Sequence, residues 1–450
     1  MADNANPKYK TIVGLEIHVE LNTKSKMFCQ CPADYFGKDP NTHVCPVCLA
    51  MPGGLPVPNK EAIRRTILLG QALNCHINNE FKFDRKHYTY PDLPKGYQIS
   101  QYDQPIAEHG TVPIKTESGV KEFRIKRVHL EEDTGKLTHE GEESLIDFNR
   151  GGVPLVEIVT EPDFDNGEDV KAFLEELQVI VRYLGIANAD MEKGDMRLEP
   201  NISVQLAEKY PELPPYKVEV KNINSFRFVK KAIEFETARH IEILEEGSTP
   251  QQETRGYDSA TGTTVTQRVK EEAADYRYFP DPDIPTFVYT DEQLDEIRAE
   301  MPEMPFAKVE RYINEFGVRE SDAQIITRDR GQAEKFEAVV TEYAKKVGIS
   351  ENEAGALVAK LMVNKKVDWE EEVGVIVEVI AKQSKPVETD SGKLAEVVDA
   401  VIAANEKAVQ DYKSGSNPNS IMFLVGQVMR EMKGQADAAT VKEALLNKLD

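Results

Sequence analysis

The sequence lacks long apolar runs, an apolar N-terminal segment and an excess of basic residues. No apolar run approaches the roughly 18 residues that a membrane helix needs, and Met1–Lys10 is polar, unlike a signal peptide. These absences argue against membrane insertion and secretion, and we expect a cytoplasmic protein that binds no membrane. With 55 Lys and Arg against 78 Asp and Glu, the formal net charge is −23. Such a balance argues against binding nucleic acid with the whole surface, because phosphate contacts need basic side chains.

Two nucleotide-binding motifs are also absent. The sequence contains neither Gly-x-x-x-x-Gly-Lys-Ser/Thr nor Gly-x-Gly-x-x-Gly. If ATP binds, it must therefore bind without a P-loop and without a Rossmann fingerprint. The 40% hydrophobic content and ordinary numbers of Gly and Pro favour a globular chain of two to four domains.

The five cysteines include two close pairs. Cys29 and Cys31 are separated from Cys45 and Cys48 by a loop that contains Gly37 and two prolines. This spacing favours four thiolates around one structural zinc, and a four-thiolate shell leaves no open position for catalysis. Disulfides are the alternative, but they require an oxidising compartment that no signal peptide supports. Cys75 fits an inert core thiol.

The hydrophobic pattern predicts an α+β fold followed by helices. Residues 11–21 alternate as in a half-buried strand, and 155–159 and 217–221 also favour strands. Helical periodicity is present at 168–184 and 226–246. We expect an N-terminal catalytic domain, built on a mostly antiparallel sheet with helices, then an all-α domain and a small α-helical tail domain. The predicted domains are 1–290 with a zinc knuckle at 29–48, a helical linker at 291–395 and a tail at 396–450, and helices are expected at 332–347, 350–363, 393–409, 420–433 and 438–449.

Acidic residues are concentrated in these strands. The segment 131–170 holds thirteen acidic residues against Lys136 and Arg150. A run of like charges is usually a solvated face, but here several carboxylates interrupt apolar runs. Carboxylates and a histidine on one sheet face suit a hard cation such as Mg²⁺. The candidates are Glu16, His18, Glu131, Glu132, Glu157 and Glu219.

Several long strings resemble the GatB family, which provides one subunit of the aspartyl/glutamyl-tRNA amidotransferase. They are Val-Gly-Leu-Glu-Ile-His-Val-Glu-Leu at 13–21, Phe-Asp-Arg-Lys-His-Tyr-Thr-Tyr-Pro-Asp-Leu-Pro-Lys-Gly-Tyr-Gln-Ile-Ser-Gln-Tyr-Asp-Gln-Pro-Ile at 83–106, His-Leu-Glu-Glu-Asp-Thr-Gly-Lys at 129–136, Asn-Arg-Gly-Gly-Val-Pro-Leu-Val-Glu-Ile-Val-Thr-Glu-Pro-Asp at 149–163, Lys-Asn-Ile-Asn-Ser-Phe-Arg at 221–227 and Asp-Tyr-Arg-Tyr-Phe-Pro-Asp-Pro-Asp at 275–283. The resemblance runs from about residue 11 to the C-terminus.

The resemblance implies a carbon–nitrogen ligase that works in a heterotrimer, together with a large amidase subunit plus a small subunit. ATP phosphorylates the side-chain carboxylate of Glu-tRNA(Gln) or Asp-tRNA(Asn). Ammonia that the amidase releases from glutamine then displaces the phosphate. The tail domain is expected to contact the tRNA. A non-catalytic tRNA-binding scaffold with structural zinc is the alternative.

The resemblance also implies roles for individual residues. His18, Glu132 and Glu157 match the magnesium ligands of the family, and Glu16, Glu131 and Glu219 match a second cation position. Lys86 matches a lysine near the ammonia tunnel and the nucleotide, although it could instead pair with Asp84 or Asp92. The expected catalytic residues are Glu16, His18, Lys86, Glu132 and Glu157, the expected cofactor-binding residues are Arg197 and Glu199, where Glu199 replaces an aspartate of the family, and the expected cofactors are ATP, Mg²⁺ and zinc.

Overall fold

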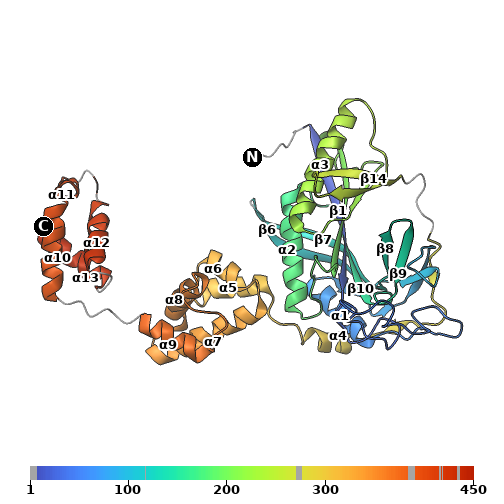
Figure 1. The fold of residues 1–450 in the computed structure, drawn as a ribbon, viewed down its shortest axis with the longest axis horizontal. Helices are drawn as coiled ribbons and strands as arrows, with labels where there is room; N and C mark the ends of the chain where they lie inside the picture. The colour runs from blue at the N-terminus through green and yellow to red at the C-terminus, as the bar shows by residue number, and fades with distance from the viewer. Residues whose placement is uncertain are drawn as a thin grey trace. The chain divides into compact units, whose positions relative to one another are not determined.

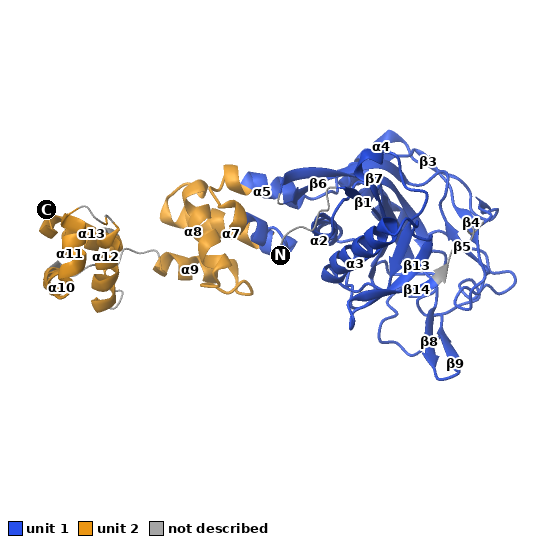
Figure 2. Ribbon diagram, turned by 90° about the horizontal axis from the view of Figure 1, so that it is seen from above, with its two compact units in different colours: residues 1–311, 323–333 blue, residues 312–322, 334–450 orange. Residues whose placement is uncertain are grey.

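The computed structural model describes residues 8–116, 118–269, 276–383, 391–414, 417, 419–432 and 436–449. Contacts divide the chain into two compact units, shown in Figure 2. Unit 1 comprises residues 1–311 and 323–333, and unit 2 comprises residues 312–322 and 334–450. No helix among the described residues has the length and apolar character needed to cross a membrane.

Unit 1 is built on a nine-stranded sheet. One pair, β12 with β13, is parallel, and the other pairs are antiparallel. In spatial order the strands are β14 (Thr263–Val269), β13 (Glu253–Asp258), β12 (Val218–Lys221), β11 (Met196–Leu206), β1 (Tyr9–Glu20), β10 (Pro154–Thr160), β7 (Gly119–Glu132), β6 (Ala107–Thr116) and β2 (His76–Ile77).

Three small sheets accompany the large one. They place loops and short strands beside the ends of the long central strands, where β5 comes close to the end of β7. The small sheets are β15 (Phe279–Pro280) with β4 (Asp84–His87) and β5 (Tyr97–Ser100), β16 (Phe287–Val288) with β3 (Glu80–Phe81), and β8 (Lys136–Glu140) with β9 (Glu143–Asp147).

The two faces of the central strands differ in chemistry. Along β1, Leu15, Ile17 and Val19 are buried in a core that includes side chains of α1 (Lys60–Ala72), α2 (Gly167–Tyr183) and α3 (Phe226–Glu245). Figure 1 shows α2 and α3 beside the sheet. Since side chains alternate along a strand, Glu16, His18 and Glu20 lie on the opposite face. The candidate site is on that polar face.

The N-terminal unit continues beyond the predicted boundary at 290. Helix α4 (Asp291–Arg298) begins with a capping box at Thr290. Its Leu294 and Ile297 belong to the same core as the central strands. The prolines at 280–305 therefore punctuate this unit before it ends, because an apolar helix face that packs on a core cannot be separated from it.

The rest of the described chain is helical, which confirms the predicted α+β class. Helix α8 has a capping box at Ser350 and Glu353. The final helices share their own small core, which includes Leu394, Leu424 and Leu445. The helices are α5 (Pro305–Asn314), α6 (Glu320–Ile326), α7 (Arg330–Val347), α8 (Glu351–Val363), α9 (Val373–Gln383), α10 (Ser391–Ala404), α11 (Glu406–Lys413), α12 (Ser420–Glu431) and α13 (Ala438–Leu449).

Candidate cation sites on the polar sheet face

Strand register brings charged side chains together on the polar face. His18 of β1 lies directly opposite Glu157 of β10 on one side and Arg197 of β11 on the other. Glu157 in turn lies opposite His129 of β7. Because residues that are paired across a sheet share a face, four strands contribute to one row of polar side chains. The flanking apolar residues face the core, so the alternation in the sequence determines this arrangement.

His18, Glu131 and Glu157 form a compact cluster, which we call the first cation site. His18 Nε2 is 3.6 Å from Glu131 Oε1 and 3.6 Å from Glu157 Oε2, and one ligand atom from each residue lies within 4.8 Å of the others. Ser100 Oγ donates a hydrogen bond to Glu131. His129 Nε2 is 3.1 Å from Glu157 Oε2, while its Nδ1 is buried without a hydrogen-bond partner among the described residues. Two carboxylates and an imidazole fit a divalent cation such as Mg²⁺.

The electrostatics of this cluster favour ionised carboxylates. Burial alone would lower the pKa of His18, but the hydrogen bond and the charge of Glu157, with the charge of Glu131, raise it to about 9. Burial alone would raise the pKa of Glu157, but His129 and His18 hold it well below its usual range. The protein thus supplies positive charge to a carboxylate pair that would otherwise repel itself. A bound cation would take over that role.

The structure places Glu132 apart from His18 and Glu157, unlike the grouping that the resemblance implies. Successive side chains of β7 point to opposite faces, so Glu131 faces the cluster and Glu132 faces away. Glu132 Oε1 accepts from Lys95 Nζ at 2.5 Å and from the Ile99 amide at 3.0 Å. It lines a cavity of ≈170 Å³ on that side.

The second predicted cation position also differs by one residue. Glu16 and Glu219 lie close together as expected, but their third partner is Glu199, not Glu131. Lys221 Nζ is 2.9 Å from both Glu199 and Glu219. Burial raises the pKa of Glu199 despite Lys221, because Glu219 adds a like charge. We call Glu16, Glu199 and Glu219 the second cation site. Three carboxylates with one lysine can bind a hard cation.

Lys86 of β4 lies beside the first cation site. Its pKa is raised: burial alone would lower it, but the charge of Glu131 and that of Glu157 outweigh burial. Asp84, one of the partners considered from the sequence, pairs instead with Lys82 at 2.9 Å. Lys86 has no ion pair within 4 Å among the described residues, and its Nζ lies 5.0 Å from the ring centroid of Tyr276.

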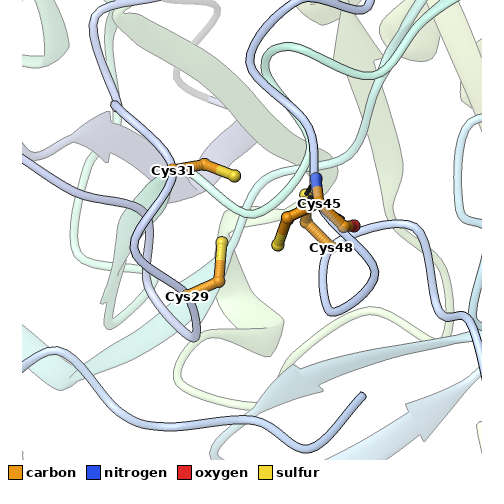
Figure 3. Close-up of side chains that lie close together, drawn as sticks. All are labelled: Cys29, Cys31, Cys45 and Cys48. Atoms are coloured by element: carbon orange, nitrogen blue, oxygen red, sulfur yellow. Dashed lines mark hydrogen bonds between the residues drawn. The ribbon is translucent and has the colours of Figure 1, made fainter. Parts of the chain in front are cut away.

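The four cysteines of the knuckle converge, as Figure 3 shows. Their sulfur atoms lie within 4.8 Å of one another, and Cys45 Sγ is 3.9 Å from Cys48 Sγ. Zinc–sulfur bonds of about 2.3 Å in a tetrahedron would separate the sulfurs by about 3.8 Å, so the cysteines fit zinc. A hydrogen bond from Cys29 and the nearby Lys26 ammonium lower the pKa of Cys48 to about 4, against the effect of burial. Cys75 is a buried thiol outside the cluster.

Comparison with known proteins matches nearly the whole chain. Residues 11–295 match the GatB/GatE catalytic domain, and residues 306–449 match the GatB domain. The GatB-type chain of the aspartyl/glutamyl-tRNA(Asn/Gln) amidotransferase from Thermotoga maritima is 45% identical over 96% of this chain and 97% of its own length. The chain of the same name from Carboxydothermus hydrogenoformans is 43% identical over 98% of this chain and 99% of its own. The chain belongs to the GatB family. The family that the sequence strings predicted is confirmed.

Within this GatB-family chain, Arg197 has a different neighbour from the one expected for a cofactor-binding residue. Its guanidinium forms two hydrogen bonds to Asp133, at 2.7 and 3.1 Å. Asp133 also lies 3.7 Å from Arg150. Glu20, whose pKa is raised well above its usual value by burial and by Asp133, accepts a hydrogen bond from Tyr35 of the knuckle loop. The described contacts of Arg197 thus join the sheet to the loop after β7.

Sequence reasoning missed several residues of these GatB-family sites. His129 lies at an i, i+2 spacing from Glu131, and Asp133 follows at the same spacing. A period of two in His129-Leu-Glu-Glu-Asp133 would have placed all three on one face. Lys95 and Lys26 carry no comparable pattern, because their partners are distant in the sequence.

Proposed function

We propose that this chain is the phosphorylating and amidating component of a tRNA-dependent amidotransferase. The observation that carries the proposal is the buried cluster of His18, Glu131 and Glu157 on one face of a GatB-family sheet. A free carboxylate is a poor electrophile, so conversion of Glu-tRNA(Gln) to Gln-tRNA(Gln) requires activation. The same reasoning applies to Asp-tRNA(Asn) and Asn-tRNA(Asn).

In the first step, a side-chain carboxylate oxygen of the aminoacyl group attacks the γ-phosphorus of ATP, and ADP leaves. His18, Glu131 and Glu157 would hold Mg²⁺, which neutralises charge on the phosphoryl group as it transfers. Their burial excludes water that would hydrolyse the acyl phosphate. Glu16, Glu199 and Glu219 would hold a second cation.

In the second step, the nitrogen of ammonia attacks the acyl-phosphate carbon, inorganic phosphate leaves and the nitrogen loses a proton. We propose that a separate amidase subunit supplies the ammonia and that a small subunit completes the heterotrimer. Lys86, which lies beside the carboxylates of the first cation site, would keep a positive charge next to the phosphoryl oxygens. The four-cysteine knuckle would hold zinc, and the tail helices would meet the tRNA.

Reconstituted turnover tests this function. The chain is co-expressed with the amidase and the small subunit, and conversion of Glu-tRNA(Gln) is followed together with glutamine- and tRNA-dependent ADP release. Glu157→Gln should abolish ADP release and leave the glutaminase activity of the amidase measurable. Wild-type turnover in Glu157→Gln would refute the cation site. A wild-type complex that binds tRNA without forming ADP would instead support a non-catalytic scaffold.

A further inference from the structure

Four tyrosines form a continuous aromatic surface that the proposed function does not use. The rings of Tyr102 and Tyr278 stack, with centroids 4.3 Å apart and planes at 12°. Tyr276 makes edge contacts with Tyr278 at 6.1 Å and with Tyr88 at 6.2 Å. These residues come from three segments, after β4, after β5 and before β15. We call these four residues the tyrosine platform.

The platform remains open to solvent although its rings contact one another. Tyr102 is 52% exposed and Tyr276 is 36% exposed. Single exposed aromatic residues are common, but adjoining exposed rings mark binding surfaces. Parallel stacking in the Tyr102–Tyr278 pair covers one face of the Tyr102 ring. With half of its surface exposed, Tyr102 can accept a further planar group by stacking.

The platform adjoins the first cation site. Lys86 links the two, because its Nζ lies 5.0 Å from the Tyr276 ring and its charge interacts with Glu131 and Glu157. The Tyr278 hydroxyl senses the same groups: burial, with the charges of Glu131 and Glu157, raises its pKa to about 12 against the effect of Lys86. A ligand on the platform would therefore have one end close to the carboxylates.

This combination selects one class of ligand. Successive tyrosine rings favour a planar π-system, as in single-stranded nucleic-acid and nucleotide sites. The buried carboxylates disfavour an acidic peptide, but they can meet phosphate groups through a divalent cation. A lysine between the rings and the carboxylates suits the phosphates of a nucleotide. A nucleobase linked to phosphates satisfies all three features.

We propose that the tyrosine platform is a stacking site for a nucleobase whose phosphates point toward the first cation site. This inference rests on the proposed function, in which two substrates carry adenine: ATP, and the 3′-terminal adenosine of the tRNA. Both offer the same stacking chemistry. Tyr102, on the open side of the stacked pair, contributes the contact surface.

The test uses the complete heterotrimer with variants at Tyr102. Affinities for Mg·ATP, for intact tRNA and for tRNA without its 3′-terminal adenosine are measured by equilibrium dialysis and filter binding. Stacking contributes about 1–3 kcal/mol per base, so Tyr102→Leu should weaken binding of one adenine source by roughly 5- to 150-fold. Tyr102→Phe keeps the ring and should stay within about twofold of wild type. Tyr102→Ala serves if the leucine variant is insoluble.

Phe36→Leu is the matched control. Phe36 is 63% exposed and has Lys193 Nζ 5.6 Å from its ring, but no aromatic contact is found for it among the described residues. A loss confined to Mg·ATP assigns the platform to ATP, and a loss confined to intact tRNA assigns it to the terminal adenosine.

The inference is overturned if both affinities of the leucine variant equal those of Phe36→Leu. It is also overturned if only binding of the amidase or the small subunit falls, which would make the platform a protein interface. Wild-type turnover distinguishes the two failures: turnover with unchanged affinities refutes the platform alone, whereas absent wild-type turnover refutes the proposed function.

Discussion

Two neighbouring glutamates should respond differently to the same substitution. Glu131 and Glu132 are both buried and adjacent in β7, yet they face opposite sides of the strand. Glu131→Gln removes a carboxylate from the first cation site, and Glu132→Gln removes the partner of Lys95. We expect the first variant to fold and lose turnover, and the second to lose stability.

The structure gives the magnitudes. The Glu132–Lys95 pair has an N–O distance of 2.5 Å and side chains only 3% and 13% exposed. Removing one partner of a buried ion pair costs about 3–5 kcal/mol. The variant amide at 132 can still accept from Ile99, so we expect about 3 kcal/mol. For Glu131→Gln, cation-assisted charge stabilisation of several kcal/mol corresponds to a loss of at least about 100-fold in kcat, at 1.36 kcal/mol per tenfold.

The assay combines urea unfolding with turnover. Far-UV circular dichroism monitors the chain, since its single tryptophan, Trp369, lies in unit 2 and does not report on the sheet. Turnover is measured as ADP release at saturating Mg²⁺. The grouping fails if Glu132→Gln unfolds like wild type and loses turnover while Glu131→Gln retains it. That result would place Glu132 at the cation, as the resemblance alone implies.

Three further predictions concern the knuckle, helix α3 and the tail. Replacing Cys45 and Cys48 by serine should lower bound zinc from about one equivalent to none by mass spectrometry of metals, and a metal-free wild-type chain would refute the knuckle. Hydrogen bonds from His240 and two further groups lower the pKa of buried Glu236 from 4.5 to about 2 against burial, which corresponds to about 3 kcal/mol. This stabilisation is present above about pH 4.5 and disappears as pH falls toward 2, so Glu236→Gln should destabilise the chain at pH 7 but hardly at pH 2.5; a pH-independent difference in urea midpoint would contradict it. Leu424→Ala should cost about 2–5 kcal/mol in the tail core and speed hydrogen exchange in α12 and α13 only, and faster exchange in α2 would show that the tail is not an independent core.

Local pattern was sufficient to predict most elements. Residues 155–159 and 168–184 were predicted within a residue or two of β10 and α2, because strict periodicity is a property of the sequence itself. The predicted helix at 393–409 is two helices, α10 and α11, since Asn405 interrupts a pattern that periodicity alone continues. The boundary at 290 reflected prolines, whereas the packing of α4 depends on a core that is distant in the sequence.

The sequence by itself determined the family, the α+β class, the cysteine knuckle and the polar face of β1, because each depends on spacing along the chain. Only the tertiary structure decided which glutamates meet. Strand register sets His18 opposite Glu157, and the pleat of β7 turns Glu131 toward them and Glu132 toward Lys95. It also moved Glu199 into the second site. Register and facing depend on how strands pair, and that is fixed by contacts between residues more than a hundred positions apart.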